Sequence, residues 1–141
     1  MPPASESRTR THALQRVTEV VFYLALGTLF THELDAVLNH EWRVMPLLSL
    51  LPDRQGMTLF VAIHVPLFAL IIGAVASHAR RMRRLVRLVI SGFLLIHAVL
   101  HYWYSDAPTY EFNSVLSSAL IYGGAGLGGV YLLLHYLVDV D

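Results

Sequence analysis

Residues 17–38 read VTEVVFYLALGTLFTHELDAVL, an apolar segment whose last part carries His32, Glu33 and Asp35. The apolar run itself covers only residues 17–30, whereas a helix needs about 20 residues to cross a bilayer. We therefore expect the helix to continue to the end of the segment and to take these three ionisable side chains into the membrane. Because ionisable groups are costly in lipid, they indicate a polar site inside a bundle of helices.

The composition is that of a membrane protein. Of the 141 residues, 55% are hydrophobic and 14% are charged, whereas about a quarter are charged in ordinary soluble domains. The mean hydropathy is +0.55. The chain has no cysteine, which excludes a disulfide framework and thiolate metal ligands. A bound metal ion would therefore need His, Asp, Glu, Tyr or backbone oxygen as ligands.

Three further apolar segments predict an all-α fold, an integral membrane four-helix bundle. A secretory signal is the alternative interpretation of residues 17–30, but no small-residue cleavage site follows them. We expect a polar N-terminal tail over residues 1–16 and a single transmembrane domain over residues 17–138. The expected spans, each long enough to cross a bilayer, are 17–38, 57–77, 85–104 and 115–137.

The arginines predict the orientation of this bundle. Four spans place both termini on one side of the membrane. Eight of the ten arginines lie in the N-terminal tail, in the second loop or, for Arg87, at the start of the third span, against Arg43 and Arg54 on the opposite side. Short basic loops remain in the cytoplasm. We therefore expect cytoplasmic N and C termini and a location in the cytoplasmic, or inner, membrane.

Polar side chains on three of the spans fall within a similar range of depths. A rise of about 1.5 Å per residue places them roughly 5–10 Å from the outer ends of their helices. His97 and His101 are related as i and i+4, and His32 and Asp35 as i and i+3, so each pair shares a helix face. The metal ligands that we predict are His32, Asp35, His64, His97 and His101, with Glu33 as a group for proton transfer.

Histidine and carboxylate ligands without sulfur favour Fe, Zn or Mn. A metal site in the outer half of the bundle would suit an oxidoreductase or hydrolase that acts on a lipid or a small apolar substrate. One alternative is a membrane electron-transfer protein with haem b held by His64 and His97 as axial ligands. Another is a non-enzymatic pathway for protons or metal ions, or a polar layer that only fixes packing.

Other polar residues receive less specific interpretations. His40, Glu41 and Trp42 lie near the interface, where we expect an ordinary solvated role. The arginine cluster is interpreted as a topology signal in contact with lipid, and no nucleic-acid partner is expected. In the fourth span, Gly124 and Gly128 permit close helix contact, either within one chain or in a homo-oligomer.

Three short motifs carry resemblances to known families. THELDA at 31–36 and HEWR at 40–43, with HAVLH at 97–101, resemble an uncharacterised family of small bacterial four-helix integral membrane proteins with a Thr-His-Glu-x-Asp signature. The first motif is also similar to membrane proteins named for His-x-x-Glu-Glu, although it lacks the paired glutamates. The third resembles one histidine box of membrane fatty-acid desaturases and hydroxylases, whose His-x-x-His-His boxes are absent here. This resemblance implies a metal site in general rather than that enzyme class.

Overall fold

The computed structural model describes residues 4–140, with side chains over residues 12–137. In this described part the chain is helical and contains four long helices, each apolar and long enough to cross a membrane. The predicted all-helical, four-helix architecture is therefore confirmed. The elements, in chain order, are α1 (Ala4–Leu38), the 3-10 turns η1 (Glu41–Arg43) and η2 (Leu48–Leu50), α2 (Asp53–Val75), α3 (Arg80–Tyr104) and α4 (Val115–Val140).

The helices extend beyond the predicted apolar spans at several of their ends. The second helix begins at Asp53, directly after Pro52, rather than near residue 57. The third helix begins at Arg80 rather than near residue 85. Hydropathy marks where a helix enters lipid, whereas backbone hydrogen bonding continues through polar residues outside it. In the same way, α1 begins at Ala4, within the polar segment that precedes the predicted first span.

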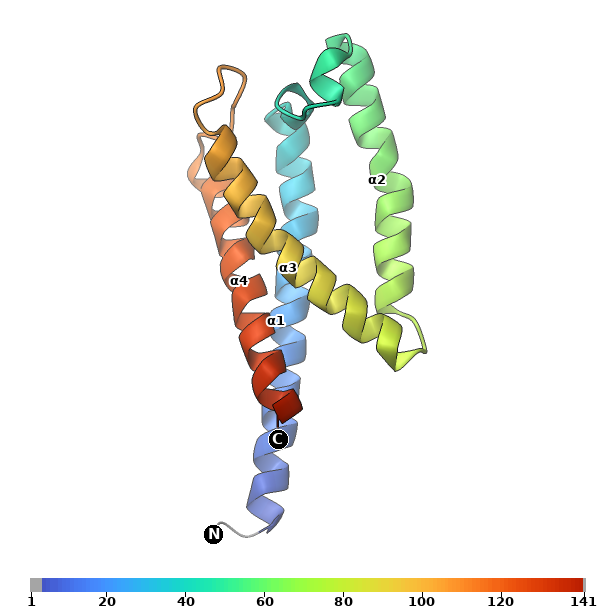
Figure 1. Cartoon of the computed structure of the whole chain (residues 1–141), viewed down its shortest axis with the longest axis vertical. Coiled ribbons are helices and arrows are strands. Elements are labelled where there is room, and N and C mark those ends of the chain that lie inside the picture. The colour runs from blue at the N-terminus through green and yellow to red at the C-terminus, as the bar shows by residue number, and fades with distance from the viewer. Residues whose placement is uncertain (1–3, 141) are drawn as a thin grey trace.

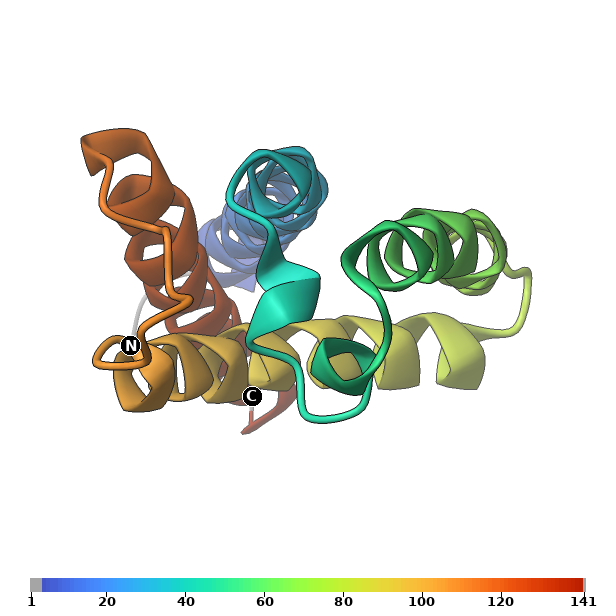
Figure 2. The ribbon, with the colours of Figure 1, turned by 90° about the horizontal axis from the view of Figure 1, so that it is seen from above.

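Three of the helices pack closely, and α2 stands apart from them (Figures 1 and 2). Helix α4 lies along α1, and α3 crosses both. The core between these three helices includes Phe22 and Leu29 of α1, Leu94 of α3 and Tyr131 of α4. On α2, by contrast, Gly56 and Phe60 are the buried residues. Side chains of α2 and α3 line the cavity that is described below.

The glycines of α4 allow its close approach to α1 and α3. A Cβ atom added at Gly128 would lie 2.6 Å from the backbone oxygen of Ser91. One added at Gly124 would lie 3.2 Å from Cγ2 of Thr28. Both glycines therefore serve contacts within the chain, whereas Gly126 has no neighbour within 4 Å of an added Cβ. Association of two copies through Gly124 and Gly128 stays a prediction.

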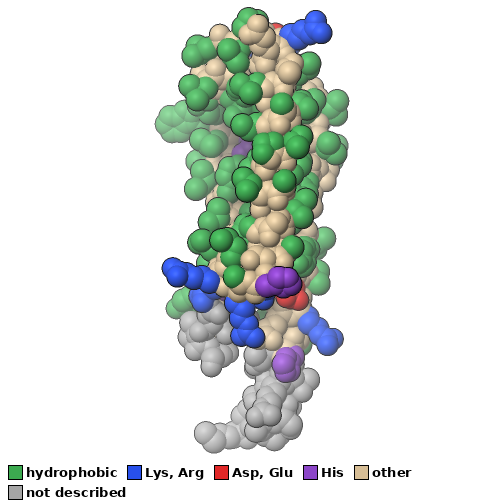
Figure 3. Space-filling model, turned by 90° about the vertical axis from the view of Figure 1, so that its right-hand side faces the viewer, with side chains coloured by type: hydrophobic (Ala, Val, Ile, Leu, Met, Phe, Trp, Pro, Cys, Tyr) green, Lys and Arg blue, Asp and Glu red, His purple; other side chains and the backbone are tan. Residues whose placement is uncertain are grey.

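The surface is that of a multi-pass membrane protein. Apolar side chains cover the face shown in Figure 3 along most of its length, and positively charged side chains gather at its lower end. Large apolar side chains of α2 are exposed, among them Val65 and Leu70, each more than 70% exposed. In water such exposure would be unfavourable, but in lipid it has no such cost. The end of the bundle opposite to the arginine cluster of residues 80–87, where α1 ends and α2 begins, contains the polar site.

Candidate metal centre

Three histidines from two helices direct their Nε2 atoms towards one another inside the bundle. His32 lies on α1, and His97 and His101 lie about one turn apart on α3. The Nε2 atom of His97 is 2.8 Å from Nε2 of His32 and 3.0 Å from Nε2 of His101. All three side chains are buried. The predicted pair on one face of α3 thus meets the predicted histidine of α1.

Hydrogen bonds between the rings cannot account for both contacts of His97. A neutral imidazole nitrogen carries either one hydrogen or one lone pair, so Nε2 of His97 serves one linear partner at a time. Because it has two nitrogen neighbours at 2.8 and 3.0 Å, one contact is left without a hydrogen bond. A metal ion accepts a lone pair from several nitrogens at once. The three rings therefore form a suitable donor set for a metal ion.

The carboxylate of Glu41 adds a fourth ligand to this set. Its Oε2 atom lies 3.7 Å from Nε2 of His32, and its Oε1 atom lies 3.8 Å from Nε2 of His101. One ligand atom from each of His32, Glu41, His97 and His101, here called the His/Glu group, lies within 4.8 Å of the others. Atoms bound about 2.1 Å from one ion lie about 3.0 Å apart at a right angle and about 3.4 Å apart at the tetrahedral angle. Small shifts of the side chains would thus let the group hold one ion.

A left-handed residue turns the chain back over the end of α1 and brings Glu41 inside. His40 has φ 51° and ψ 43°, a conformation that is uncommon outside glycine. Two residues later, Trp42 is buried, with 2% of its surface exposed. Its ring lies so close to Gly56 of α2 that a Cβ atom there would be 3.0 Å away. The turn and the buried indole together direct the intervening Glu41 into the bundle.

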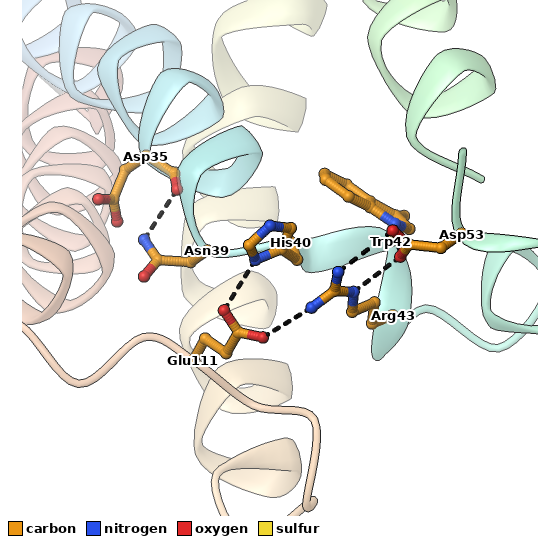
Figure 4. A network of polar contacts seen from close by, with 7 residues as sticks. All are labelled: Asp35, Asn39, His40, Trp42, Arg43, Asp53 and Glu111. Carbon is orange, nitrogen blue, oxygen red and sulfur yellow. Dashed lines mark hydrogen bonds and ion pairs between the residues drawn. The ribbon is translucent and has the colours of Figure 1, made fainter. Parts of the chain in front are cut away.

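Polar contacts around η1 hold this turn in place (Figure 4). Nδ1 of His40 donates to Oε2 of Glu111 at 2.7 Å, and Nη1 of Arg43 donates to Oε1 of the same residue at 3.0 Å. Nε of Arg43 and Nε1 of Trp42 both donate to Oδ1 of Asp53, at 2.8 and 3.0 Å. These contacts join both loops at this end of the bundle to the start of α2.

His101 has a polar partner on the opposite side of its ring. Its Nδ1 atom lies 3.1 Å from the hydroxyl of Tyr110. Histidines that bind metals usually make such a bond through their second nitrogen, which fixes the tautomer and the orientation of the ring. Burial raises the pKa of Tyr110 to about 12, so the side chain stays a neutral hydroxyl. With the hydrogen on Nδ1, the Nε2 atom is left with a lone pair facing the His/Glu group.

The carboxylate of Glu41 lies among other acidic groups. Burial, together with the negative charges of Glu33 and Asp35, raises the pKa of Glu41 to about 8. Within the described part of the chain, its Oε2 atom has no hydrogen-bond partner. A carboxylate that is desolvated among like charges is stabilised strongly by a cation.

Asp35, which the sequence predicted as a ligand, lies outside the His/Glu group. Its side chain is 7% exposed, and its Oδ2 atom has no hydrogen-bond partner among the described residues. Asn39 donates at 2.8 Å to the backbone oxygen of Asp35 rather than to its carboxylate (Figure 4). His32, one turn earlier, also has an unpartnered buried nitrogen, Nδ1. Asp35 is therefore better placed to act on its neighbours through its charge than to join the four ligand atoms.

His64 also lies outside this group and pairs with Glu33. Its Nε2 atom is 2.8 Å from Oε2 of Glu33, and its Nδ1 atom donates to the backbone oxygen of Phe60 at 2.6 Å. His64 and His97 thus direct their Nε2 atoms at different partners rather than at each other. The alternative of haem held between these two histidines stays a prediction.

An apolar cavity lies beside both the His/Glu group and the pair formed by Glu33 and His64, here called the two polar sets. It has a volume of about 390 Å³ and lies between α2, α3 and the loop that follows α1. Residues of both polar sets line this cavity. Most of the remaining lining residues are apolar, such as Ile63, Leu67 and Leu100. A cavity of this kind, mostly apolar with a few convergent polar groups, is typical of small-molecule sites. The polar residues that line it are Glu33, Glu41, His64, His97, His101, Tyr104 and Tyr110.

A family model described as a family of unknown function, DUF6713, matches residues 18–138. The chain belongs to this family. The match includes all four residues of the His/Glu group, and it confirms the expectation of an uncharacterised family. The Thr-His-Glu-x-Asp signature and the bacterial origin stay predictions. No curated protein and no solved structure matches the chain.

Two residues of the site were not among the predicted ligands or their partners. Glu41 was assigned an interfacial role because it follows the end of the first span, and Tyr110 lies in the loop between α3 and α4. The position of Glu41 depends on the left-handed turn at His40, which no periodicity predicts. The available signal was Trp42, a large aromatic residue that can pull its neighbours towards the core when it is buried.

Proposed function

We propose that this protein is a multi-pass membrane metalloprotein whose His/Glu group binds a transition metal ion. The observation that carries the proposal is the convergence of three buried histidine nitrogens and a carboxylate within 4.8 Å. Among the metals expected from the sequence, a set of three imidazoles and one carboxylate suits Fe or Zn better than Mn, which prefers oxygen ligands. The unpartnered Oε2 atom of Glu41 supports the same conclusion.

The cavity supports an enzymatic role for the bound ion. Glu41, His97 and His101 belong both to the His/Glu group and to the cavity wall, so a ligand in the cavity would lie against the ion. Such an ion supplies Lewis-acid or redox chemistry. Because the remaining wall is largely apolar, we propose a lipid or another small apolar molecule as the substrate of a hydrolytic or oxidative reaction.

We further propose that the arginine-rich end of the bundle faces the cytoplasm in the cytoplasmic membrane. This rests on the bias of arginine towards the loop between α2 and α3 and towards the termini. Because the chain has no cysteine, single Ser77→Cys and Ser105→Cys variants test it directly. A membrane-impermeant thiol reagent added to intact cells should label the Ser105→Cys variant alone. The reverse labelling would overturn the orientation.

Metal content tests the proposed centre. The protein should be purified in detergent with an affinity tag that contains no histidine, and Fe, Zn and Mn should be measured by elemental analysis. We expect at least one ion per chain, and one ion fewer in the His97→Ala variant. His78→Ala is the matched control, because His78 is exposed in the loop between α2 and α3 and lies outside the His/Glu group.

Two results would contradict this proposal. If His97→Ala and His78→Ala variants retain the same metal content as the unchanged protein, the His/Glu group is not the binding site. If the purified protein instead shows a Soret absorption band that His64→Ala removes, the haem alternative holds. Circular dichroism of each variant separates loss of metal from loss of helical structure.

A further inference from the structure

The pair formed by Glu33 and His64 needs a cation between its two facing atoms. A backbone oxygen only accepts hydrogen bonds, so the 2.6 Å contact with Phe60 places a hydrogen on Nδ1 of His64. In neutral histidine the Nε2 atom then has a lone pair, and this lone pair faces Oε2 of Glu33 at 2.8 Å. Two lone pairs at this distance repel each other. Either a shared proton or a metal ion in contact with both atoms removes the repulsion.

The arrangement of His64 is the one that metal-binding histidines adopt. Such residues typically donate their second ring N–H to a backbone carbonyl or a carboxylate, and bind the ion through the remaining nitrogen. His64 makes this bond to Phe60, and Glu33 supplies an oxygen ligand beside it. Both side chains are largely buried, with 15% and 14% of their surface exposed. Both also lie in helical segments, α2 and α1, that hold the pair in position.

The acidic side chains around the cavity favour the binding of cations. Glu33 and Glu41 both line the cavity, and the buried Asp35 lies two residues from Glu33 on α1. No arginine is found among the residues that line this cavity in the described part of the chain. Arg43, which follows close behind Glu41, is paired with Asp53 and Glu111 instead. Glu33, Asp35 and Glu41 can together carry three negative charges, and one divalent ion in the His/Glu group would compensate two of them. The third charge would still attract a further cation to the cavity.

We propose that Glu33 and His64 bind a second divalent transition metal ion, in the same cavity as the ion of the His/Glu group. Glu41 belongs to the His/Glu group and lines the cavity that Glu33 and His64 also line, so we assign it as the carboxylate shared by the two ions. Pairs of metal ions in one site commonly act together by holding the attacking and the leaving oxygen of a substrate. This inference extends the proposed function from one ion to two.

Titration with Co²⁺ tests the second position without any assay of activity. Metal-free full-length protein in detergent should be titrated by equilibrium dialysis, with the bound Co²⁺ counted by elemental analysis. We expect two ions per chain in the unchanged protein and one in the His64→Ala variant. Glu33→Gln should also bind one ion. Glutamine keeps the size of the side chain and can still bond to His64, so this variant remains informative if His64→Ala does not fold.

The outcomes separate the second ion from the first. His78→Ala should still bind two ions, because its side chain lies outside both sets. The second position is overturned if the unchanged protein, His64→Ala and Glu33→Gln each bind one ion. The first position would then remain intact, and Glu33 and His64 would share a proton. The same conclusion follows if two ions remain in both variants, because another site would then hold the second ion. If His97→Ala binds no Co²⁺ at all, Glu33 and His64 do not bind an ion by themselves. This result would overturn the second metal position as an independent site.

Discussion

The hydroxyl of Tyr110 lies 3.1 Å from Nδ1 of His101, on the side of the ring opposite to the Nε2 atom that faces the His/Glu group. This contact fixes the orientation of the ring, and when the hydroxyl accepts from Nδ1 it leaves the lone pair on Nε2. In the proposed metal centre, Tyr110 is therefore a positioning residue, because it would act on the ion through His101.

Removing this hydroxyl should weaken metal binding without abolishing it. We expect Tyr110→Phe to raise the Kd of the ion in the His/Glu group by about 10- to 100-fold, the usual effect of losing a hydrogen bond to a ligating histidine. Competition with a chelator of known affinity measures this change. Tyr102→Phe is the matched control, because Tyr102 is 74% exposed. Equal Kd values for the two variants would show that Tyr110 does not position His101.

Asp35 should affect the metal-free and the metal-bound protein in opposite directions. Its carboxylate is buried, and Oδ2 lacks a hydrogen-bond partner among the described residues, which costs about 1–3 kcal/mol for a buried polar group. We expect Asp35→Asn to raise the melting temperature in the presence of a chelator, because a neutral amide costs less to bury than a carboxylate. It should lower the metal affinity, because the ion loses a nearby negative charge.

Melting curves recorded with chelator and with added Zn²⁺ test both signs in one experiment. Asp106→Asn serves as the control, since Asp106 lies exposed in the loop between α3 and α4. If Asp35→Asn lowers the melting temperature equally in both conditions, Asp35 has a purely structural role.

Part of this site could be predicted from the sequence, and part depends on geometry that patterns do not contain. Hydropathy predicted the four helices, and the i, i+4 spacing predicted that His97 and His101 share a face. The rise per residue also placed His64 near the depth of His97. The rise per residue contains no information on how separate helices are rotated relative to one another. For this reason it did not predict that His64 faces Glu33. Glu41 lies inside because His40 adopts a left-handed conformation and the neighbouring Trp42 is buried.

The ion pairs of Glu111 should make the stability depend on acid pH. The hydrogen bond from His40 and the charge of Arg43 hold the pKa of Glu111 below its usual value of 4.5. The unfolded chain therefore binds this proton more readily than the folded chain, and the contribution present at neutral pH is lost as the pH falls below that value. We expect Glu111→Gln to lower the melting temperature at pH 7 and to have little effect near pH 3. A difference that is unchanged between these two pH values would contradict this role.

Close packing of α4 against α3 should make Gly128 sensitive to a single added methyl group. An added Cβ atom would lie 2.6 Å from the backbone oxygen of Ser91, so Gly128→Ala must push the two helices apart. Overpacking of this kind costs about 1–3 kcal/mol. Gly126→Ala is the matched control, because an added Cβ has no neighbour within 4 Å there. Melting followed by tryptophan fluorescence should show a lower transition temperature for Gly128→Ala alone, and equal transitions would contradict the close contact between α3 and α4.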